Sequence, residues 1–232
     1  MSFAPQKTSN EFVFLKARYL VELTGRKARN LEELASYIST ADPSTIFYHV
    51  FHPLLDAHLV PYEYPNDFSF WLSDSLQDKD LAEQVASIDL PESGGLEEVR
   101  RLLVRRIRLA LETSAQLSQY SVHPGNEFNF VKCRYVVLPA GQEARTLDEL
   151  ADDVSQASEL SIFYHMVTSR LFNASKYDDF SRWILENTEE AELAEQIRKI
   201  DPSTHMNVRT LQQELLDVIS HYLRRKAMKH IK

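Results

Sequence analysis

The stretch EFVFLKARYLVELTGRKARNLEELASYISTADPSTIFYH occupies residues 11–49, and residues 127–165 read EFNFVKCRYVVLPAGQEARTLDELADDVSQASELSIFYH. The two stretches align without a gap at a constant offset of 116, and about half of their positions are identical. The offset then falls by four, so that LAEQVASID at residues 81–89 matches LAEQIRKID at residues 193–201. Self-similarity on this scale sets the architecture before any local pattern is considered. The sequence therefore predicts a tandem duplication of one module.

The duplication divides the chain into a first module at residues 11–117, a linker at residues 118–126 and a second module at residues 127–226. Each module of about 115 residues is close to the usual size of a domain. A duplicated chain can form within itself the contact that two subunits form in a homodimer. We therefore expect the modules to pack about a pseudo-twofold axis, with either one fused core or two docked ones.

Most of each module has the pattern of amphipathic helices. Residues 31–38 and 147–154 each follow an N-capping residue type and have acids in the first turn, and residues 96–117 and 208–228 form long closing helices. Residues 12–23 fit both an alternating strand and a helical stripe, and we favour a helix with a short extended entry. Gly25 and Gly141 predict a turn at the same place in each module. The expected fold class is mainly α, with short strands at the start of each module.

Composition narrows the function classes. The net charge of -8 argues against a nucleic-acid binder, because binding to phosphates requires an excess of Lys and Arg. The single cysteine, Cys133, excludes an internal disulfide, and we expect it to be a small buried side chain. No stretch approaches the ~20 apolar residues needed to span a bilayer, and the N-terminus does not resemble a signal peptide. The expected location is the cytoplasm, with no membrane and no nucleic-acid partner.

One group of histidines could bind a metal ion. His49 and His52 are three residues apart on an expected helix, so their rings share a face, and His58 follows shortly after. A carboxylate from Glu63 or Asp67 would complete a ligand set that zinc or another divalent transition metal accepts. The second copy has Thr168 in place of His52. The alternative, which we favour, is that one histidine is hydrogen-bonded in the core and the others line a surface.

Two short blocks recur in both copies, Phe-Tyr-His and Asp-Phe-Ser-x-Trp. Asp67 and Asp179 could each hydrogen-bond the histidine of the same module, His49 or His165, and so fix its ring. Each aspartate could instead cap the helix that it precedes, and we favour capping. The only two tryptophans, Trp71 and Trp183, occupy matching positions and are expected to be core residues, although an indole N–H often lies beside a cleft.

Other charged stretches fit a solvated surface. The arginines of the first closing helix, Arg100 to Arg108, could bind an anion, but pairing with Glu97, Glu98 and Glu112 at helical distances is the simpler interpretation. No glycine-rich phosphate loop, nucleophile elbow or catalytic triad signature is present.

The blocks LTGRKARNLEEL, IFYHVFH, PNDFSFWL and LAEQVASID together resemble an uncharacterised prokaryotic family of domains of unknown function that often occur in tandem. That family's pattern has a TGRKA-x-NL-x-EL block, a YHH-like block and a PPNDFAYWV-like block, and the resemblance covers about residues 12–223. The second copy departs from the pattern at Thr168 and Asp178 and in its shortened loop. The positions of the first copy that match the pattern are His49, His52, His58, Pro65, Asn66, Asp67, Phe68 and Trp71. The resemblance implies no activity, but it suggests an accessory role in carbohydrate metabolism, because similar proteins often accompany sugar-transfer enzymes.

These observations favour a non-catalytic binding or assembly module whose protein or small-molecule ligand the sequence does not identify. The alternative is a metal-dependent enzyme or metal sensor that uses His49, His52 and His58. The oligomeric state is left open. The residues expected to contribute to a ligand site are His49, His52, His58, Glu63, Asp67, Trp71, His165, Asp179 and Trp183.

Overall fold

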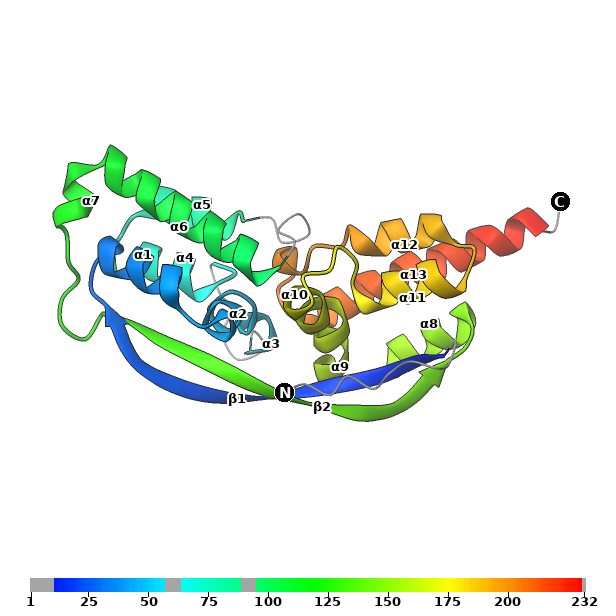
Figure 1. The fold of residues 1–232 in the computed structure, drawn as a ribbon. Coiled ribbons are helices and arrows are strands. Elements are labelled where there is room, and N and C mark those ends of the chain that lie inside the picture. Colours follow the sequence, from blue (N-terminus) through cyan, green and yellow to red (C-terminus); the bar gives the residue numbers. More distant parts are fainter. Residues whose placement is uncertain (1–10, 57–63, 89–94, 231–232) are drawn as a thin grey trace.

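A computed structural model describes residues 11–56, 64–88 and 95–230 of the chain. Its organising element is a ribbon of two antiparallel strands, β1 (Phe12–Ala28) and β2 (Phe128–Ala144), each 17 residues long. The helices of the described residues all lie on one face of this ribbon (Figure 1). The ribbon therefore forms a floor that runs beneath the whole molecule.

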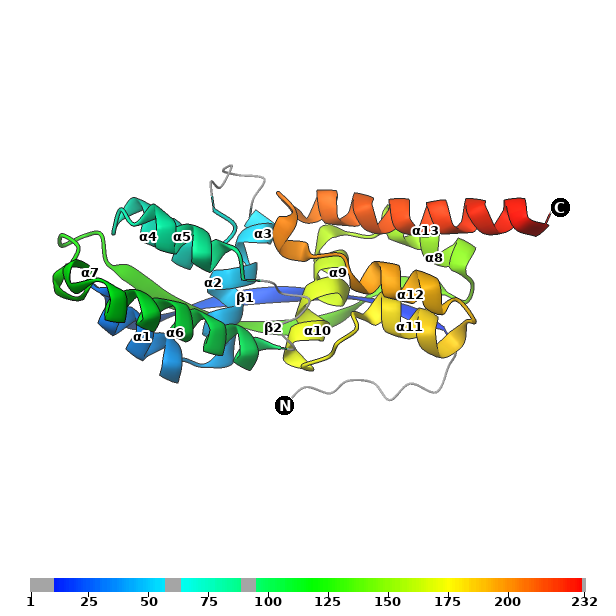
Figure 2. The same ribbon diagram turned by 90° about the horizontal axis from the view of Figure 1, so that it is seen from above.

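The helices fall into two groups along the ribbon, one from each half of the chain, and the ribbon passes beneath both groups (Figure 2). The first half contains α1 (Leu31–Thr40), α2 (Pro43–Phe51), α3 (Pro53–Asp56), α4 (Asp67–Asp74), α5 (Lys79–Ala86), α6 (Leu96–Thr113) and α7 (Ala115–Gln119). The second half contains α8 (Leu147–Gln156), α9 (Glu159–Phe163), the π-helix η1 (Tyr164–Thr168), α10 (Ser169–Phe172), α11 (Asp179–Asn187), α12 (Ala191–Arg198), the 3-10 helix η2 (Pro202–Thr204) and α13 (Val208–His230).

The strands pair along almost their full length. Phe12 pairs with Ala144 and Ala28 with Phe128, so Tyr19 and Tyr135 face each other at the centre. Aromatic and β-branched residues are frequent in this segment, and such residues favour strands. The register shifts twice. One shift lies between Leu23 and Lys27, where Gly25 is, and the other lies opposite the segment of β2 that contains Gly141. Both glycines have positive φ. The turn that the glycines predicted is therefore a bulge inside each strand.

Each strand begins against the half of the chain that it does not belong to. The ring of Phe12 in β1 stacks on Phe180 of the second half at 4.8 Å, and the ring of Phe128 in β2 stacks on Phe68 of the first half at 4.9 Å. The two strands then cross the molecule and lead into α1 and α8. Buried apolar residues of both halves form one continuous cluster, which includes all four of these rings. The start of each strand therefore completes the core of the opposite half.

The ribbon contradicts the expected fold class. That expectation was of a mainly α chain made of two helical modules of about 115 residues, packed about a pseudo-twofold axis with at most short strands. The segment from residue 12 to residue 23, favoured as a helix, is strand throughout. The strand wins because Phe12 and Phe14, two residues apart, both point into the core while the backbone of the segment pairs with β2. Because each strand begins in contact with the opposite half, buried residues of the two halves form one continuous cluster.

The helices themselves follow the sequence pattern closely. Asn30 and Thr146 cap α1 and α8, and Thr146 forms a capping box with Glu149. In α6 the buried residues are spaced as Leu96, Val99, Leu103 and Ile107, and α13 buries Val208, Leu211, Leu215 and Ile219 at the same spacing. Within the described part of the chain, every helix is too short or too polar to cross a membrane.

Candidate functional site

In the first half, a histidine joins the start of β2 to the helices above it. His49 is buried on α2, and its Nδ1 lies 2.8 Å from Oδ2 of Asp67 at the start of α4. The backbone N–H of Val131 donates to Nε2 of the same ring at 2.9 Å. Because Nε2 accepts this hydrogen bond, the ring carries its proton on Nδ1 and donates it to Asp67. The imidazole therefore links two helices to a strand from the other half.

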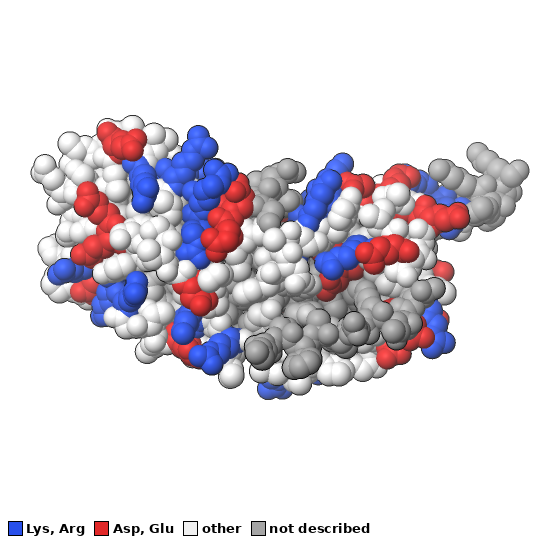
Figure 3. All heavy atoms as spheres, in the orientation of Figure 1, with Lys and Arg blue, Asp and Glu red and all other residues white. Residues whose placement is uncertain are grey.

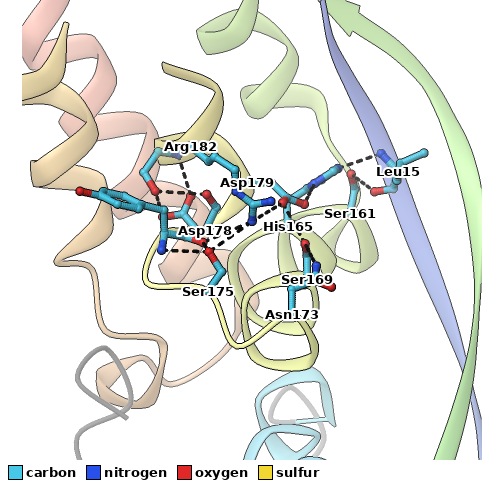
Figure 4. A network of polar contacts seen from close by, with 11 residues as sticks. Leu15, Ser161, His165, Ser169, Asn173, Ser175, Asp178, Asp179 and Arg182 are labelled. Carbon is cyan, nitrogen blue, oxygen red and sulfur yellow. Dashed lines mark hydrogen bonds and ion pairs between the residues drawn. The ribbon is translucent and has the colours of Figure 1, made fainter. Parts of the chain in front are cut away.

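The second half contains the same link at aligned residues. Nδ1 of His165 lies 2.8 Å from Oδ2 of Asp179, and the N–H of Leu15 donates to its Nε2 at 2.8 Å. The hydroxyl of Ser161 also donates to the carbonyl of Leu15 at 2.7 Å, so both polar groups of this strand residue are satisfied. Figure 4 shows His165 between β1 and the start of α11, with Ser161 beside it. Each of these links fixes the beginning of a strand against the opposite half.

The Asp–His hydrogen bonds settle the role of the two recurring aspartates. We favoured capping for Asp67 and Asp179, and this is wrong, since each residue is the first of its helix. The caps are the preceding residues, Asn66 and Asp178, which accept from the N–H groups of Ser69 and Ser181. One residue of displacement leaves the aspartate free to face the histidine, and the alternative interpretation of an Asp–His pair is confirmed.

The carboxylate in the second half has more partners than its counterpart. Oδ1 of Asp179 accepts from the hydroxyl of Ser169 at 2.8 Å and lies 3.2 Å from the guanidinium of Arg182. Burial alone would raise the pKa of Asp179, but hydrogen bonds from His165 and Ser169 together with Arg182 lower it below its ordinary value. The neighbouring Asp178 is fully buried, and burial raises its pKa. Asp179 is therefore the more acidic of these two neighbouring carboxyl groups.

The geometry excludes two kinds of chemistry at the histidines as they stand. A general base needs a ring nitrogen that faces a substrate, and both nitrogens of His49 and of His165 are used within the chain. Ser169, Asp179 and His165 contain the residue types of a catalytic triad, but the serine lies on the aspartate and not on Nε2. A hydroxyl in that place cannot pass its proton to the imidazole. In both halves the histidine instead joins the helices of its own half to the strand from the other half.

Aromatic rings surround each Asp–His pair in the same way. Phe128 lies 4.7 Å from the ring of His49 and Phe12 lies 4.9 Å from that of His165. Trp71 and Trp183 are both buried, as expected of core residues, and each meets the strand phenylalanine edge-on. The indole N–H of Trp71 donates to the carbonyl of Asn126 at 2.7 Å. The two tryptophans complete the pockets that receive the strand ends.

The expected metal ligands are only partly within the described residues. His58 and Glu63 lie outside them. His52 is the C-cap of α2, and its ring stacks on that of Tyr48 at 4.7 Å. In the part of the chain that the structure describes, no group of three or more His, Cys, Asp or Glu side chains could hold a metal ion. His49 could become a ligand only by giving up a hydrogen bond to Asp67 or to Val131, and the metal site remains a prediction.

Lys and Arg side chains gather over α6 with acidic side chains beside them (Figure 3). Arg100 bonds Glu97 at 2.9 Å, and Arg101 pairs with Glu98. These are the pairs that the helical spacing predicted. Cys133 is buried, and burial raises the pKa of its thiol to about 12, so it has the character of a small apolar residue rather than a reactive thiolate.

Three features of the structure have little or no signature in the sequence. The strand N–H groups of Leu15 and Val131 fix the histidines but have no side-chain signature. The hydroxyl of Tyr19 lies 2.6 Å from that of Thr168, so the residue that replaces His52 in the second half joins β1 to η1. A cavity of about 1010 Å³ lies between α4 and α5 on one side and α6 and α7 on the other. Of these three, only the cavity has a signal in the sequence, namely the small residues at and after the end of α6 that line it.

Comparison with known proteins places the chain in a family. No curated protein matches it. A solved structure described as "The structure of OrfY from Thermoproteus tenax" is similar, with 36% sequence identity and a TM-score of 0.82, over 91% of this chain and 94% of that one. The model of a family described as "Family of unknown function (DUF5752)" matches residues 9–229. The chain belongs to this family.

Proposed function

We propose that the protein is a non-catalytic binding or assembly module. The observation that carries the proposal is the state of the two buried imidazoles, because each has both ring nitrogens engaged with the chain itself. The polar residues that recur in both halves therefore support the fold and offer no free acid, base or nucleophile to a substrate. Functions that need only a surface fit this arrangement better than functions that need reactive groups.

The surface with the clearest character is the open face of the ribbon, which we define by Lys16, Arg18, Leu20, Arg134, Val136 and Leu138. Residues that pair directly across an antiparallel ribbon point to the same face. Arg18 pairs with Val136, Leu20 with Arg134 and Lys16 with Leu138, whereas Tyr19 and Tyr135 between them point to the helices. Leu20 is 60% exposed and Val136 is 51% exposed. Apolar side chains exposed together on one sheet face are typical of an interaction site.

The charges on the open face indicate the kind of partner. Three of its six residues are cationic, although the chain as a whole carries a net charge of -8. By the same pairing rule Glu22 and Lys132 continue this face, and Glu22 bonds Arg134 at 2.8 Å and Lys132 at 3.2 Å. Lys16 and Arg18 provide the remaining positive charge of the face. A local reversal of sign favours a partner with an acidic surface, since opposite potentials steer association. We therefore propose that the open face binds a partner protein through an acidic surface of that partner.

Two further expectations stay with the proposal. An accessory role in carbohydrate metabolism rests on the family resemblance alone. In that role, the acidic partner would be a protein of carbohydrate metabolism. The metal-dependent alternative requires His49 to leave its present hydrogen bonds. Elemental analysis of protein purified without a histidine tag tests that alternative, because a stoichiometric metal that is lost in His52→Ala would support it.

The proposed function is tested by photo-crosslinking. A photoreactive amino acid replaces Leu20 on the open face, and a matched control replaces Met206, which is also exposed but lies in the second half's helical layer. A protein captured through position 20 alone is identified, produced in pure form and titrated against the chain. We expect an acidic partner whose affinity falls at least about tenfold in Leu20→Glu/Val136→Glu, which corresponds to about 1.4 kcal/mol.

Two results would contradict the proposal. One is equal capture from positions 20 and 206, with unchanged affinity in the double variant. The other is turnover of a metabolite by the purified chain. A self-association that the double variant abolishes would replace the acidic partner by a second copy.

A further inference from the structure

The cavity between α4, α5, α6 and α7 lies on the helical layer, away from the open face of the ribbon, so it can be tested independently of the proposed function. Its volume is about 1010 Å³. Its walls contain three carboxylates, Asp74, Asp78 and Asp80, and one cation, Lys79. Among the described residues, none of these three carboxylates forms an ion pair. The half-exposed ring of Phe70 adds an apolar surface.

The second half shows what occupies the corresponding place there. An offset of 112 aligns LAEQVASID with LAEQIRKID, and it also aligns the buried residues Val99, Leu103 and Ile107 of α6 with Leu211, Leu215 and Ile219 of α13. Continued by one more turn, the offset aligns Ala110, Thr113 and Ser114 with Tyr222, Arg225 and Lys226. The α6 residues of this set line the cavity. The α13 residues are much larger.

These larger residues of α13 fill their place and bind its acids. The hydroxyl of Tyr222 donates to Glu190, Lys226 pairs with the same carboxylate, and Arg225 pairs with Glu192. The guanidinium of Arg225 also lies over the ring of Tyr222, 5.3 Å from its centroid. The hydrogen bond to Glu190 raises the pKa of Tyr222 to about 12, so the phenol keeps its proton. One face of α13 therefore supplies an aromatic ring and two cations to two carboxylates.

The first half has acids at the same positions but no large side chains that bind them. Asp78 and Asp80 stand at the positions of Glu190 and Glu192, and one oxygen of Asp78 caps α5 by accepting from Leu81 at 2.9 Å. The three facing residues are small, and α6 ends at Thr113, after which Ser114 caps the start of α7. The first half therefore has two carboxylates at these positions and no Tyr, Arg or Lys at the three aligned positions opposite them.

We propose that this cavity binds a helical segment of a partner protein that carries an aromatic residue followed by cations three and four positions later. The segment would place its ring against Phe70 and Ala110 and its cations at Asp78 and Asp80. It would pack beside α6, which itself holds the position of α13, and would supply the side chains that α6 lacks. Such a ligand complements the lining, because the carboxylates can only accept hydrogen bonds and their net charge favours cations.

The test uses the full chain and a synthetic peptide of residues 218–228, the segment that fills the corresponding place in the second half. Fluorescence anisotropy follows a labelled peptide, and the control peptide has alanine at positions 222, 225 and 226. We expect saturable binding of the first peptide, at least about tenfold weaker binding of the control, and weakening at raised salt.

Two variants of the chain complete the test. Ala110→Tyr/Thr113→Arg/Ser114→Lys introduces the residues of α13 and should abolish peptide binding while circular dichroism shows a folded chain. Should that variant not fold, Asp80→Lys at an unpaired surface carboxylate decides, with an expected loss of at least about tenfold. Absence of peptide binding, equal binding of the control peptide, or undiminished binding to Asp80→Lys would each overturn the proposal.

Discussion

The two halves of the chain keep one device and differ in another. Both clamp the incoming strand with an Asp–His pair, a strand N–H group and a stacked phenylalanine, at aligned residues and within 0.1 Å of the same distances. They differ where α6 faces the segment before α5 and α13 faces the segment before α12. Tyr222 and its neighbours on α13 fill the space there, whereas Ala110 on α6 leaves a cavity. Recurrence identifies what the fold needs, and the difference identifies where a ligand has room.

The strand exchange explains why the clamps recur. A strand that begins against the other half must be held there by contacts outside its own sequence neighbourhood, and a buried hydrogen bond from its backbone meets this need at one point. The pairing of β1 with β2 then joins the halves along most of the two 17-residue strands. We infer that the halves unfold together, because each loses part of its core when the other opens.

The largest expected effect is on the strand phenylalanines. Phe12→Ala and Phe128→Ala each remove a buried ring that stacks on a ring of the opposite half. Large-to-small changes of this kind cost about 3–5 kcal/mol. Chemical denaturation followed by far-UV circular dichroism measures the free energy of unfolding. Equal costs in both halves support the equivalence of the two clamps, whereas a cost below about 1 kcal/mol in either would break it.

The next effect separates the two aspartates. Asp179 accepts from His165 and Ser169 and pairs with Arg182, while His49 is the only partner of Asp67 among the described residues. We expect Asp179→Ala to cost about 3 kcal/mol and Asp67→Ala about 2 kcal/mol, since each lost charged hydrogen bond counts. Denaturation at pH 7 measures both. A larger cost for Asp67→Ala would contradict the network in the second half.

A smaller effect concerns the hydroxyl pair between Tyr19 and Thr168, 2.6 Å apart. A double-mutant cycle with Tyr19→Phe and Thr168→Val isolates the hydrogen bond from the packing of the two side chains. We expect a coupling of about 1 kcal/mol, the usual worth of a buried neutral hydrogen bond. Additive costs in the double variant would show that the hydroxyls contribute independently.

The smallest effect appears only at high pH. Burial raises the pKa of Tyr164 to about 12, and it also raises the pKa of Tyr19 and of Tyr135. The folded state therefore holds protons that the unfolded state releases above about pH 10, so stability is full below that pH and falls as the pH rises. We expect Tyr19→Phe to reduce the slope of stability against pH between 9 and 11 more than Tyr135→Phe does. An identical slope in wild type and Tyr19→Phe would contradict the burial of this phenol.

Local signals predicted the helices well and the strands poorly. Asn30 and Thr146 mark the starts of α1 and α8 because capping is decided by a few neighbouring residues. The segment from Phe12 to Ala28 has no comparable mark, since a strand is stabilised by a partner that here lies more than 100 residues away in the sequence. The same distance hides the exchange, because nothing in Phe12 itself indicates that it packs on Phe180.

The site was predictable in its residue types but not in its roles. Repetition singled out His49, Asp67 and their counterparts, and these residues do lie together. Their role depends on a third partner, a backbone N–H group that has no sequence signature. It also depends on where α4 begins, because Asn66 is the N-cap and Asp67 is already the first residue of the helix. The cavity could have been found by extending the offset of 112 past Ile107 to the small residue at Ala110.

The exchange of strands is tested most directly by hydrogen exchange and mass spectrometry on Phe12→Leu and Phe128→Leu, two mild changes at the aligned strand ends. We predict that Phe12→Leu, a change near the N-terminus, accelerates exchange mainly in α11 and η1 of the second half, and that Phe128→Leu does so mainly in α2 and α4 of the first. Faster exchange confined to the half that contains the substituted residue would contradict the account.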